Sequence, residues 1–379
     1  MAGRVLLITN DFPPRLGGIE SYLRDFCSCL DPERLVVFAS TRTSTGEQEA
    51  YDASLPYRVY RARDRVLLPL PHTARQIAEI IRREKIDTVW FGAAAPLGLL
   101  APACRRAGAR RIISTTHGHE VGWSMIPGAR QVLRQIGRTS DVVTYISRYT
   151  RSRFAAAFGP GVAFERLPSG VDTQRFSPSV EQGLMVRRRH AIAEGAPVVV
   201  CISRLVRRKG QDMLIRSMPA VLASNPEAKL LIVGDGPRRG ALSDLARECA
   251  VADSVIFAGK VSYEDLPAYY NAADVFAMPA RTRGAGLDVE GLGIVYLEAQ
   301  ACGVPVVAGE SGGAPETVLD GQTGLVVDGT SARAVAHGLL TILGDRDLAV
   351  TMGRRGREYV EAEWTWDAMS ARFRKILGF

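Results

Sequence analysis

The chain has 379 residues, 46% of them hydrophobic and 23% charged, and a formal net charge of +8. This length predicts two domains, and the composition excludes a fibrous or disordered chain. We expect neither a secretory leader nor a membrane-spanning helix, because the first apolar run is only Val5–Thr9 and none approaches roughly 20 residues.

In chain order, the first half alternates short apolar runs with segments of helical periodicity. Ser147 is a suitable N-cap for a helix that begins at Arg148. The predicted strands are Val5–Thr9, Leu35–Ser40, Tyr57–Tyr60, Thr88–Gly92, Arg111–Thr115 and Asp141–Ile146, and the clearest helices are Ile19–Leu30 and His72–Lys85.

The alternation pauses near Leu167–Asp172, where we place a domain boundary, and residues 173–196 are predicted to be irregular. It then restarts and ends in an amphipathic helix, Trp364–Leu377, which the pattern assigns to neither domain. The strands predicted here are Val198–Ser203, Lys229–Val233, Ser254–Ala258, Val275–Met278 and Pro305–Ala308. Two such runs predict an α/β protein of two Rossmann-like domains facing across a cleft, with ligands at the carboxyl ends of the strands.

Two loops could hold an anion. Gly17 and Gly18 precede the first helix, where backbone N–H groups and the helix dipole favour negative charge, although such a turn is more often structural and lacks the GxGxxG spacing of dinucleotide sites. Arg204 and Lys209 lie in a basic loop directly after the first strand of the second domain. That position favours phosphate binding over a merely solvated loop.

Glu290 and Glu298 flank a glycine-rich stretch, and their spacing alone is common by chance. If Gly291–Ile294 opens a helix, its free N–H groups point at a ligand phosphate. Glu298 then lies about two turns along that helix, on nearly the same face as Glu290. One carboxylate could bind sugar hydroxyls and the other ribose hydroxyls.

Other residue types exclude several chemistries. His117 and His119 lack a third zinc ligand, so a single histidine that hydrogen-bonds a sugar is the better interpretation. The six cysteines are scattered, which favours reduced thiols over a metal site. Asp345–Asp347 is the only Asp-x-Asp and falls in a predicted polar turn, and neither GxSxG nor a P-loop motif occurs.

Charge is unevenly distributed along the chain. Residues 1–170 contain 24 Lys and Arg against 15 Asp and Glu, a net +9, whereas residues 171–379 carry a net −1. This asymmetry indicates different binding partners for the two halves. An arginine-rich surface that serves only solubility explains the charge equally well.

The sequence resembles the family-4 retaining glycosyltransferases of the GT-B fold, whose signature is two glutamates eight positions apart. The matching segments, in order, are Gly17-Gly18, Ser203–Gly210, Gly234–Pro237, Glu290–Glu298 and Gly312–Glu316. Four longer runs resemble the actinobacterial members that add the second mannose of phosphatidylinositol mannosides from GDP-mannose. These runs are Thr9–Arg15, Trp90–Pro96, Thr116–Met125 and Ala280–Ile294.

The resemblance implies roles for individual residues. Arg204 and Lys209 stabilise the leaving diphosphate, so no metal and no cofactor is expected, and attack comes from the front face of the sugar. The implied donor-binding residues are Gly17, Gly18, Arg204, Lys209, Lys260, Val261, Glu290 (sugar), Gly291, Leu292, Gly293, Ile294 and Glu298 (ribose), with guanine near Gly259–Val261. The implied catalytic residues are His117, Arg204, Lys209 and Glu290, and the acceptor-binding residues are Asn10, Asp11, His117 and His119.

The resemblance also implies that the last helix returns to the first domain. The expected domains are therefore residues 1–169 with 366–379, which bind the acceptor and face the membrane, and residues 170–365, which bind the nucleotide sugar. The implied acceptor is an anionic phosphoinositide glycolipid on the inner face of the plasma membrane, with the protein cytoplasmic and peripheral and no nucleic-acid partner. Candidate lipid contacts are Arg58, Arg61, Arg63, Arg65, Arg75, Arg130 and Arg134.

Three alternatives remain open at this point. The first is a glycosyltransferase with another glycolipid or a soluble acceptor. The second is a nucleotide-sugar epimerase of the same two-domain architecture. The third is a non-enzymatic anion-binding protein, which the combination of Arg204, Lys209, Glu290 and Glu298 disfavours.

Overall fold

The computed structural model describes residues 3–15, 17–42 and 45–379. The chain divides into two compact units, Met1–Ser169 with Trp366–Phe379, and Gly170–Thr365. These bounds coincide with the domain limits expected above. In the part of the chain that is described, no helix is both long enough and apolar enough to span a membrane.

The first unit is built on a seven-stranded parallel sheet with the strand order β3-β2-β1-β4-β5-β6-β7. Its strands are β1 (Val5–Thr9), β2 (Leu35–Ala39), β3 (Arg58–Arg61), β4 (Thr88–Phe91), β5 (Arg111–Thr115), β6 (Val142–Tyr145) and β7 (Ala163–Arg166). Strand order reverses between β1 and β4, the position at which open α/β sheets bind ligands. β1 and β2 are buried at every residue, which explains their continuous apolar sequence.

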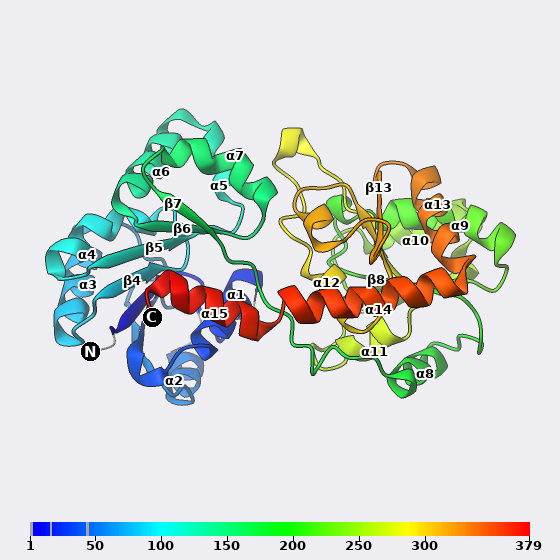
Figure 1. Cartoon of the computed structure of the whole chain (residues 1–379), viewed down its shortest axis with the longest axis horizontal. Helices are drawn as coiled ribbons and strands as arrows, with labels where there is room; N and C mark the ends of the chain where they lie inside the picture. The colour runs from blue at the N-terminus through cyan, green and yellow to red at the C-terminus, as the bar shows by residue number, and fades with distance from the viewer. Residues whose placement is uncertain (1–2, 16, 43–44) are drawn as a thin grey trace. The chain divides into compact units, whose positions relative to one another are not determined.

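Helices cover both faces of this sheet (Figure 1). They are α1 (Gly18–Ser28), α2 (Thr45–Ala53), α3 (Pro71–Arg83), α4 (Ala101–Ala107), α5 (Glu120–Met125), α6 (Pro127–Thr139), α7 (Arg148–Phe158) and α15 (Trp366–Leu377). Alternate residues of β1 point to opposite faces. Val5 and Leu7 therefore share a core with α1 and α15, whereas Leu6 and Ile8 share one with α3 and α4.

Helix α15 is held in the first unit by aromatic packing. The ring of Phe373 lies 5.0 Å from that of Phe26 on α1 and 4.7 Å from that of Trp90 on β4. Nε of Arg111 also donates to the carbonyl of Ile376 at 2.7 Å. The last helix thus completes one face of a sheet that begins at residue 5.

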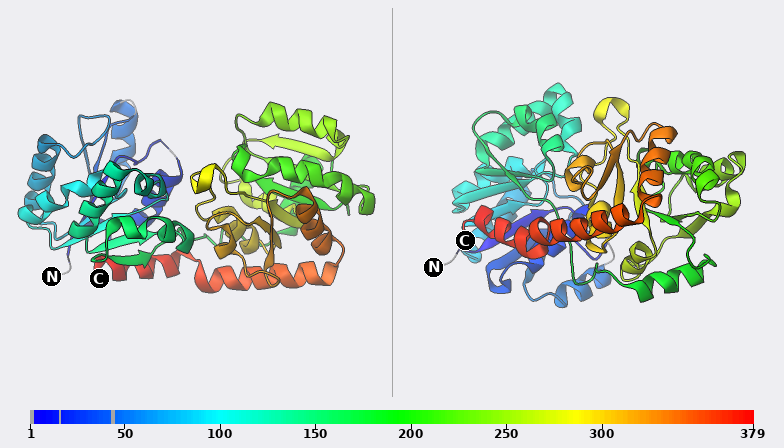
Figure 2. Two further views of the ribbon diagram at one scale, coloured as in Figure 1. Left: turned by 90° about the horizontal axis from the view of Figure 1, so that it is seen from above. Right: turned by 45° about the vertical axis from the view of Figure 1, so that its right-hand side comes forward.

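The second unit has a six-stranded parallel sheet with the order β10-β9-β8-β11-β12-β13. Its strands are β8 (Val198–Ile202), β9 (Lys229–Val233), β10 (Val255–Gly259), β11 (Val275–Met278), β12 (Val306–Gly309) and β13 (Gly324–Val327). Its helices are α8 (Val180–Arg189), α9 (Gln211–Ser224), α10 (Arg239–Glu248), α11 (Leu266–Asn271), α12 (Ile294–Ala301), α13 (Ala332–Leu343) and α14 (Arg346–Glu363) (Figure 2). One continuous core cluster joins them.

Three sequence expectations about elements were wrong. Residues 173–196 are not irregular throughout, because α8 forms with Ser179 as its N-cap and Val186 buried on α11's side of the unit. The short strands β7 and β13 were not expected, since their burial is only partial. The final helix begins at Trp366, because Trp364 is buried in the second unit and its carbonyl accepts from the N–H of Val171 at 2.7 Å.

Candidate functional site

In the second unit, the loops that follow β8, β9, β10 and β11 touch one another. The N–H of Gly234 donates to the carbonyl of Gly259 at 2.7 Å, and the N–H of Leu205 donates to the carbonyl of Asp235 at 3.0 Å. Gly210 has a φ of 78°, and a Cβ there would lie 2.0 Å from the carbonyl oxygen of Pro279. Only glycine fits this approach, which fixes the basic loop against the end of β11.

Lys209 and Glu290 form an ion pair within this group of loops. Nζ of Lys209 lies 2.5 Å from Oε2 of Glu290, and their side chains are only 12% and 10% exposed. The backbone of Glu290 is held on both sides, because its N–H donates to Oγ of Ser311 at 3.3 Å and its carbonyl accepts from the N–H of Gly313 at 2.9 Å. The glutamate is therefore fixed beside the ammonium group before any ligand binds.

The glycine-rich stretch ends where α12 begins. Gly293 is the N-cap, with a φ of 88°, and Ile294 is the first helical residue. The expectation of a helix start here is confirmed, but the placement of both glutamates on one helical face is wrong. Glu290 precedes the helix, because the left-handed turn at Gly293 redirects the chain, and Glu298 lies about one turn into it.

Glu298 has a different environment from Glu290. Its Oε2 accepts a hydrogen bond of 2.6 Å from the hydroxyl of Tyr270, which comes from α11. Burial raises the pKa of Glu298 to about 7, and the Tyr270 hydrogen bond acts in the opposite direction. This carboxylate therefore changes charge near neutral pH.

The remaining predicted residues of the second unit lie at the same edge of the sheet. Arg204 follows β8 and is exposed, and no hydrogen bond from its guanidinium to another described residue is present. Lys260 and Val261 directly follow β10, the lysine exposed and the valine partly buried. Leu292 is buried beside Gly291 and Gly293. This edge combines cationic groups, free N–H groups of a helix start and two carboxylates.

In the first unit, His117 lies at the carboxyl ends of β4 and β5. Its Nε2 is 2.7 Å from the carbonyl of Gly92, so this nitrogen carries the proton and Nδ1 is left as an acceptor. The ring stands edge-on to that of Tyr22, with centroids 5.1 Å apart. Burial lowers the pKa of His117 to about 4, so the imidazole is neutral at physiological pH.

Glu120 fixes the loop that carries His117. The carboxylate is 3% exposed and accepts from the N–H of His117 at 3.2 Å and from the N–H of Gly118 at 3.1 Å. Burial raises the pKa of Glu120. The conformation of this loop is therefore held by a side chain of the loop itself, Glu120, three residues after His117.

Of the other predicted residues of the first unit, Asn10 and Asp11 have partners within the protein. Both ends of the Asn10 amide bond the backbone of Leu67, at 3.0 and 2.6 Å, and Oδ1 of Asp11 pairs with Arg42 at 2.9 Å. Gly17 and Gly18 stand at the start of α1, and Leu16 lies outside the described residues. His119 is exposed.

No cluster of three or more His, Cys, Asp or Glu able to hold a metal ion occurs in residues 3–15, 17–42 and 45–379. All six cysteines are free thiols.

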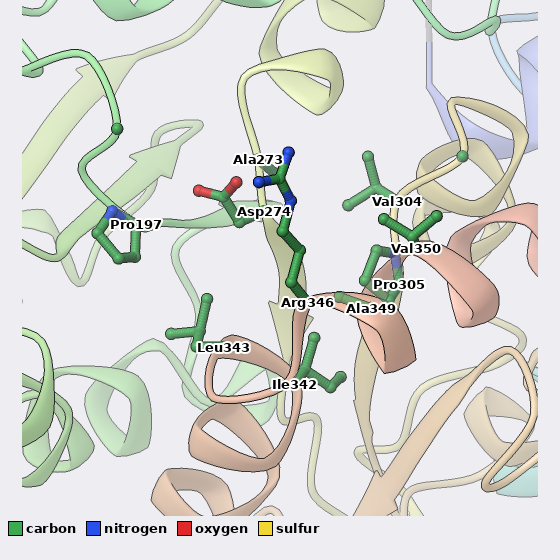
Figure 3. A pocket seen from close by; sticks show the side chains of 12 residues that line it. Pro197, Ala273, Asp274, Val304, Pro305, Ile342, Leu343, Arg346, Ala349 and Val350 are labelled. Atoms are coloured by element: carbon green, nitrogen blue, oxygen red, sulfur yellow. The ribbon is translucent and has the colours of Figure 1, made fainter.

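A cavity of about 580 Å³ in the second unit lies at the opposite edge of its sheet. Figure 3 shows Pro197, Asp274 and Pro305, which precede β8, β11 and β12, with Arg346 of α14 standing among them. Oδ2 of Asp274 is already bonded to Arg187 at 2.8 Å and to the N–H of Val198 at 2.7 Å. None of the predicted site residues lines this cavity.

The sequence interpretation missed four residues that organise the two edges. Gly92 and Glu120 stood within motifs that were singled out, but no role was assigned to them. Ser311 precedes a recognised Gly-Gly pair, which is a weak signal. Tyr270 carried no signal, because its partner lies 28 residues away on another helix.

Comparisons with known proteins agree with this architecture. Residues 16–175 match the family model described as Glycosyltransferase Family 4, and residues 185–359 match the model described as Glycosyl transferases group 1. Among solved structures, HepE of Anabaena in complex with UDP has a TM-score of 0.80 at 19% identity, covering 99% of both chains. Sucrose-phosphate synthase of Thermosynechococcus elongatus has a TM-score of 0.79 at 24% identity, covering 99% of this chain and 98% of its own. These likenesses show the GT-B fold.

Curated relatives match almost the whole chain. The GDP-mannose-dependent monoacylated alpha-(1-6)-phosphatidylinositol monomannoside mannosyltransferase of Corynebacterium glutamicum is 55% identical, over 99% of this chain and 97% of its own. The GDP-mannose-dependent alpha-(1-6)-phosphatidylinositol monomannoside mannosyltransferases of Mycolicibacterium smegmatis and Mycobacterium tuberculosis (strain H37Rv) are 54% and 53% identical, over 98% and 99% of this chain and 98% of each relative. With its two family-specific domains, the chain belongs to the glycosyltransferase family of these mannosyltransferases.

Proposed function

We propose that this protein is an α-mannosyltransferase that moves mannose from GDP-mannose to a phosphatidylinositol monomannoside, adding the second mannose. The observation that carries the proposal is the 53–55% identity, over nearly the full length, to relatives named for this reaction. The Lys209–Glu290 ion pair just before α12 and the buried carboxylate of Glu298 in that helix support a nucleotide-sugar donor.

The chemistry proposed for the second unit follows from its charges. When the C1–O bond of the donor breaks, negative charge grows on the GDP diphosphate, and Lys209 and Arg204 stabilise it electrostatically. For this, Glu290 exchanges its bond to Lys209 for hydroxyls of the mannose when the donor binds, before the C1–O bond breaks. The acceptor hydroxyl forms the new bond to C1 on the same face, and its proton passes to the leaving phosphate. No metal ion or cofactor takes part in this proposal.

The test of the proposed function is a transfer assay with purified protein. GDP-mannose is offered with phosphatidylinositol monomannoside in acylated and non-acylated forms, other glycolipids and soluble sugars, and the product linkage is determined. We expect an α-mannosyl product only on the phosphatidylinositol monomannoside. Transfer to a soluble acceptor instead would refute the acceptor assignment. Conversion of GDP-mannose to another sugar nucleotide in the absence of acceptor would favour an epimerase.

We also propose that the first unit binds the inner face of the membrane reversibly. Two segments combine exposed arginines with exposed apolar side chains, an arrangement suited to an anionic lipid surface. In the first, Arg63, Arg65 and Arg75 accompany Val66, Leu68 and Leu70, which are 48%, 46% and 43% exposed. In the second, Arg130 and Arg134 accompany Met125 and Ile126, which are 51% and 60% exposed.

Two of the arginines expected to contact lipid have other partners. Arg61 is 14% exposed and bonds both carboxylate oxygens of Asp52, at 2.7 and 2.9 Å, so it does not fit a lipid-binding role. Arg58 pairs with Glu84 at 2.8 Å but remains 57% exposed. The proposal therefore keeps Arg58 and excludes Arg61.

Vesicle sedimentation tests the membrane proposal. We expect the protein to pellet with anionic vesicles and not with neutral ones, and Arg130→Glu with Arg134→Glu to weaken this by several-fold. The matched control is Arg188→Glu with Arg189→Glu, the same charge change on exposed arginines of α8 in the second unit. Equal binding to neutral and anionic vesicles would refute the proposal.

A further inference from the structure

We propose that Tyr270 is a positioning residue for donor binding, because its hydroxyl holds the carboxylate of Glu298 in the orientation that receives the ribose. The inference rests on the proposed function, in which Glu298 binds the donor ribose. Tyr270 itself is buried and does not contact the ligand in this scheme; it acts through Glu298. Its role is therefore separable from that of the residues that touch the donor.

The hydrogen bond between Tyr270 and Glu298 is short and buried. The hydroxyl of Tyr270 is 2.6 Å from Oε2 of Glu298, and the two side chains are 0% and 7% exposed. Among the described residues, no other side-chain hydrogen bond to this carboxylate is found. The second oxygen, Oε1, thus remains for ribose hydroxyls, and rotation of the carboxylate would break a bond in a nearly dry environment.

The side chain of Tyr270 is held in place by its neighbours. Its ring packs on Phe276 of β11, with centroids 5.4 Å apart, and edge-on to Phe176, with centroids 5.8 Å apart. The Phe176 segment is in turn tied down, because Nη1 of Arg357 donates to the Phe176 carbonyl at 2.7 Å and to the carbonyl of Ala301, at the end of α12, at 2.6 Å. The hydroxyl on α11 and the carboxylate on α12 are thus held in one framework.

The same framework is tied to α11 by its last residue. The amide nitrogen of Asn271 donates to the carbonyls of Ser177 and Pro267, both at 2.9 Å, and its oxygen accepts from the N–H of Ser179 at 2.8 Å. Residues 176–179 are therefore hydrogen-bonded to α11 beside Tyr270, whose ring Phe176 contacts. Little freedom is left for the phenol ring to follow Glu298 if the carboxylate moves.

The hydrogen bond also affects the charge of Glu298. Burial raises the pKa of Glu298 to about 7, and the Tyr270 hydroxyl opposes that rise by stabilising the carboxylate. Other titratable or charged groups on the surrounding elements are Cys302 directly after α12, Arg357 on α14, Glu316 on the short helix Ala314–Thr317, and Tyr263, which acts on Tyr270. Removing the hydroxyl leaves the burial unopposed, so Glu298 is protonated to a higher pH and accepts ribose hydroxyls less well.

The neighbouring tyrosine provides a matched control. Tyr269 lies on the same helix and is 2% exposed, but its hydroxyl contacts Nε2 of His190 at 3.2 Å instead of Glu298. Tyr269→Phe and Tyr270→Phe therefore remove the same atom from adjacent buried positions. A general effect of losing a buried hydroxyl would appear in both variants.

The experiment measures binding of GDP, 2′-deoxy-GDP and 3′-deoxy-GDP by calorimetry at pH 7 and pH 9. We expect Tyr270→Phe to weaken GDP binding about fivefold to tenfold at pH 7, which corresponds to the net contribution of one ordinary hydrogen bond. The preference for GDP over the deoxy nucleotides should shrink, and the weakening should lessen at pH 9. Tyr269→Phe should match the unmodified protein in all three respects.

Glu298→Gln tests the inference from the other partner. The amide does not titrate, so the GDP affinity of Glu298→Gln should depend less on pH between pH 6 and pH 9 than that of the unmodified protein, which gains a carboxylate through about pH 7. Tyr270→Phe should reduce GDP affinity less in the Glu298→Gln background than in the unmodified protein. Equal effects of Tyr269→Phe and Tyr270→Phe, or equal weakening of GDP and deoxy nucleotides by Tyr270→Phe, would overturn the inference.

Because GDP binding needs neither acceptor nor transfer, the two proposals can fail separately. The protein could bind GDP with the effects expected for Tyr270→Phe and Tyr269→Phe and yet transfer no mannose. This result would refute the proposed function and support the role of Tyr270. If UDP binds in place of GDP, the same series with UDP and its deoxy analogues supports or overturns the role in the same way. Binding of neither nucleotide would overturn it.

Discussion

The two units present the carboxyl ends of similar parallel sheets, but the residues at the centre of these edges differ in charge. In the second unit the edge holds charged groups, with Lys209 paired to Glu290 and Glu298 bonded to Tyr270. In the first unit the central residue is a neutral histidine, His117, bonded to the carbonyl of Gly92. A common topology thus supports one edge suited to a leaving diphosphate and another suited to uncharged hydroxyls.

The cores differ as well. The second unit has one continuous hydrophobic cluster, whereas the first unit has three, of which one depends on the last helix of the chain. The second unit is complete in sequence from residue 170 to residue 365, and the first is not complete until residue 366 onwards has folded back. The first unit therefore depends on the far end of the chain, and the second does not.

The largest effect is expected from the charged edge. Lys209→Ala should lower kcat/KM for GDP-mannose by about 10²- to 10³-fold, because it removes a cation from the developing diphosphate charge and leaves Glu290 buried without its partner. Glu290→Ala should be similarly severe, and the double variant less than multiplicative. Steady-state kinetics measures this. Lys229→Ala, at the amino end of β9, is the control, and a loss there equal to that of Lys209→Ala would contradict the assignment.

The dependence of the first unit on the chain end can be tested at Phe373. Phe373→Ala removes a fully buried ring that packs on Phe26 and Trp90, and should destabilise the first unit by about 3–5 kcal/mol. Denaturant unfolding, followed by hydrogen exchange of each unit, measures this. Phe379→Ala, at a 39% exposed position on the same terminus, should cost far less. A loss confined to the second unit would refute this account.

The close packing of the second unit's loops can be tested at a glycine. Gly210→Ala should destabilise the unit by about 2–3 kcal/mol, because the residue has positive φ and its Cβ would meet the Pro279 carbonyl. Gly321→Ala has a similar φ, 72°, with open space around the Cβ, and should cost only about 1 kcal/mol. Thermal unfolding of both variants separates steric overlap from backbone strain. Equal losses would show that the overlap contributes nothing.

A smaller effect should distinguish the neutral edge from the charged one through pH. The pKa of His117 is about 4 in the folded protein and near 6.5 when unfolded, so the unfolded state takes up the proton first. The contribution of His117 to stability is therefore full above about pH 6.5 and falls as pH drops toward 4. In His117→Gln, the loss of stability between pH 7 and pH 5 should be smaller than in the unmodified protein. An unchanged loss would contradict the depressed pKa.

Glu298 should act with the opposite sign. Its pKa is raised to about 7, so the folded protein holds this proton more tightly than the unfolded chain does. Its contribution to stability is present below about pH 4.5 and is lost as pH rises through 7. Glu298→Gln should therefore gain stability relative to the unmodified protein between pH 5 and pH 8, measured by urea unfolding. The absence of any relative gain over this range would show that the carboxylate is charged throughout.

The sequence alone determined the repeated α/β pattern, most strand positions and the chemical character of the two edges. Apolar runs such as Val5–Thr9 and Lys229–Val233 can be recognised because a buried parallel strand leaves no polar alternation. The residues at strand ends, such as Arg204 and His117, follow from chain position, because the carboxyl ends of parallel strands share one edge. These features are local or repeat along the chain.

The tertiary structure decided the pairings between distant residues. The Lys209–Glu290 pair spans 81 positions and the Tyr270–Glu298 hydrogen bond spans 28, and neither spacing has a periodicity that a sequence pattern can reveal. Likewise, Asn10 bonds Leu67 and Arg61 bonds the carbonyl of Pro13 only because the segment after β1 lies against β3 and the loop that follows it. Burial and partner geometry set the charge of Glu298 and His117, so residue type identified these groups but only folding fixed their protonation.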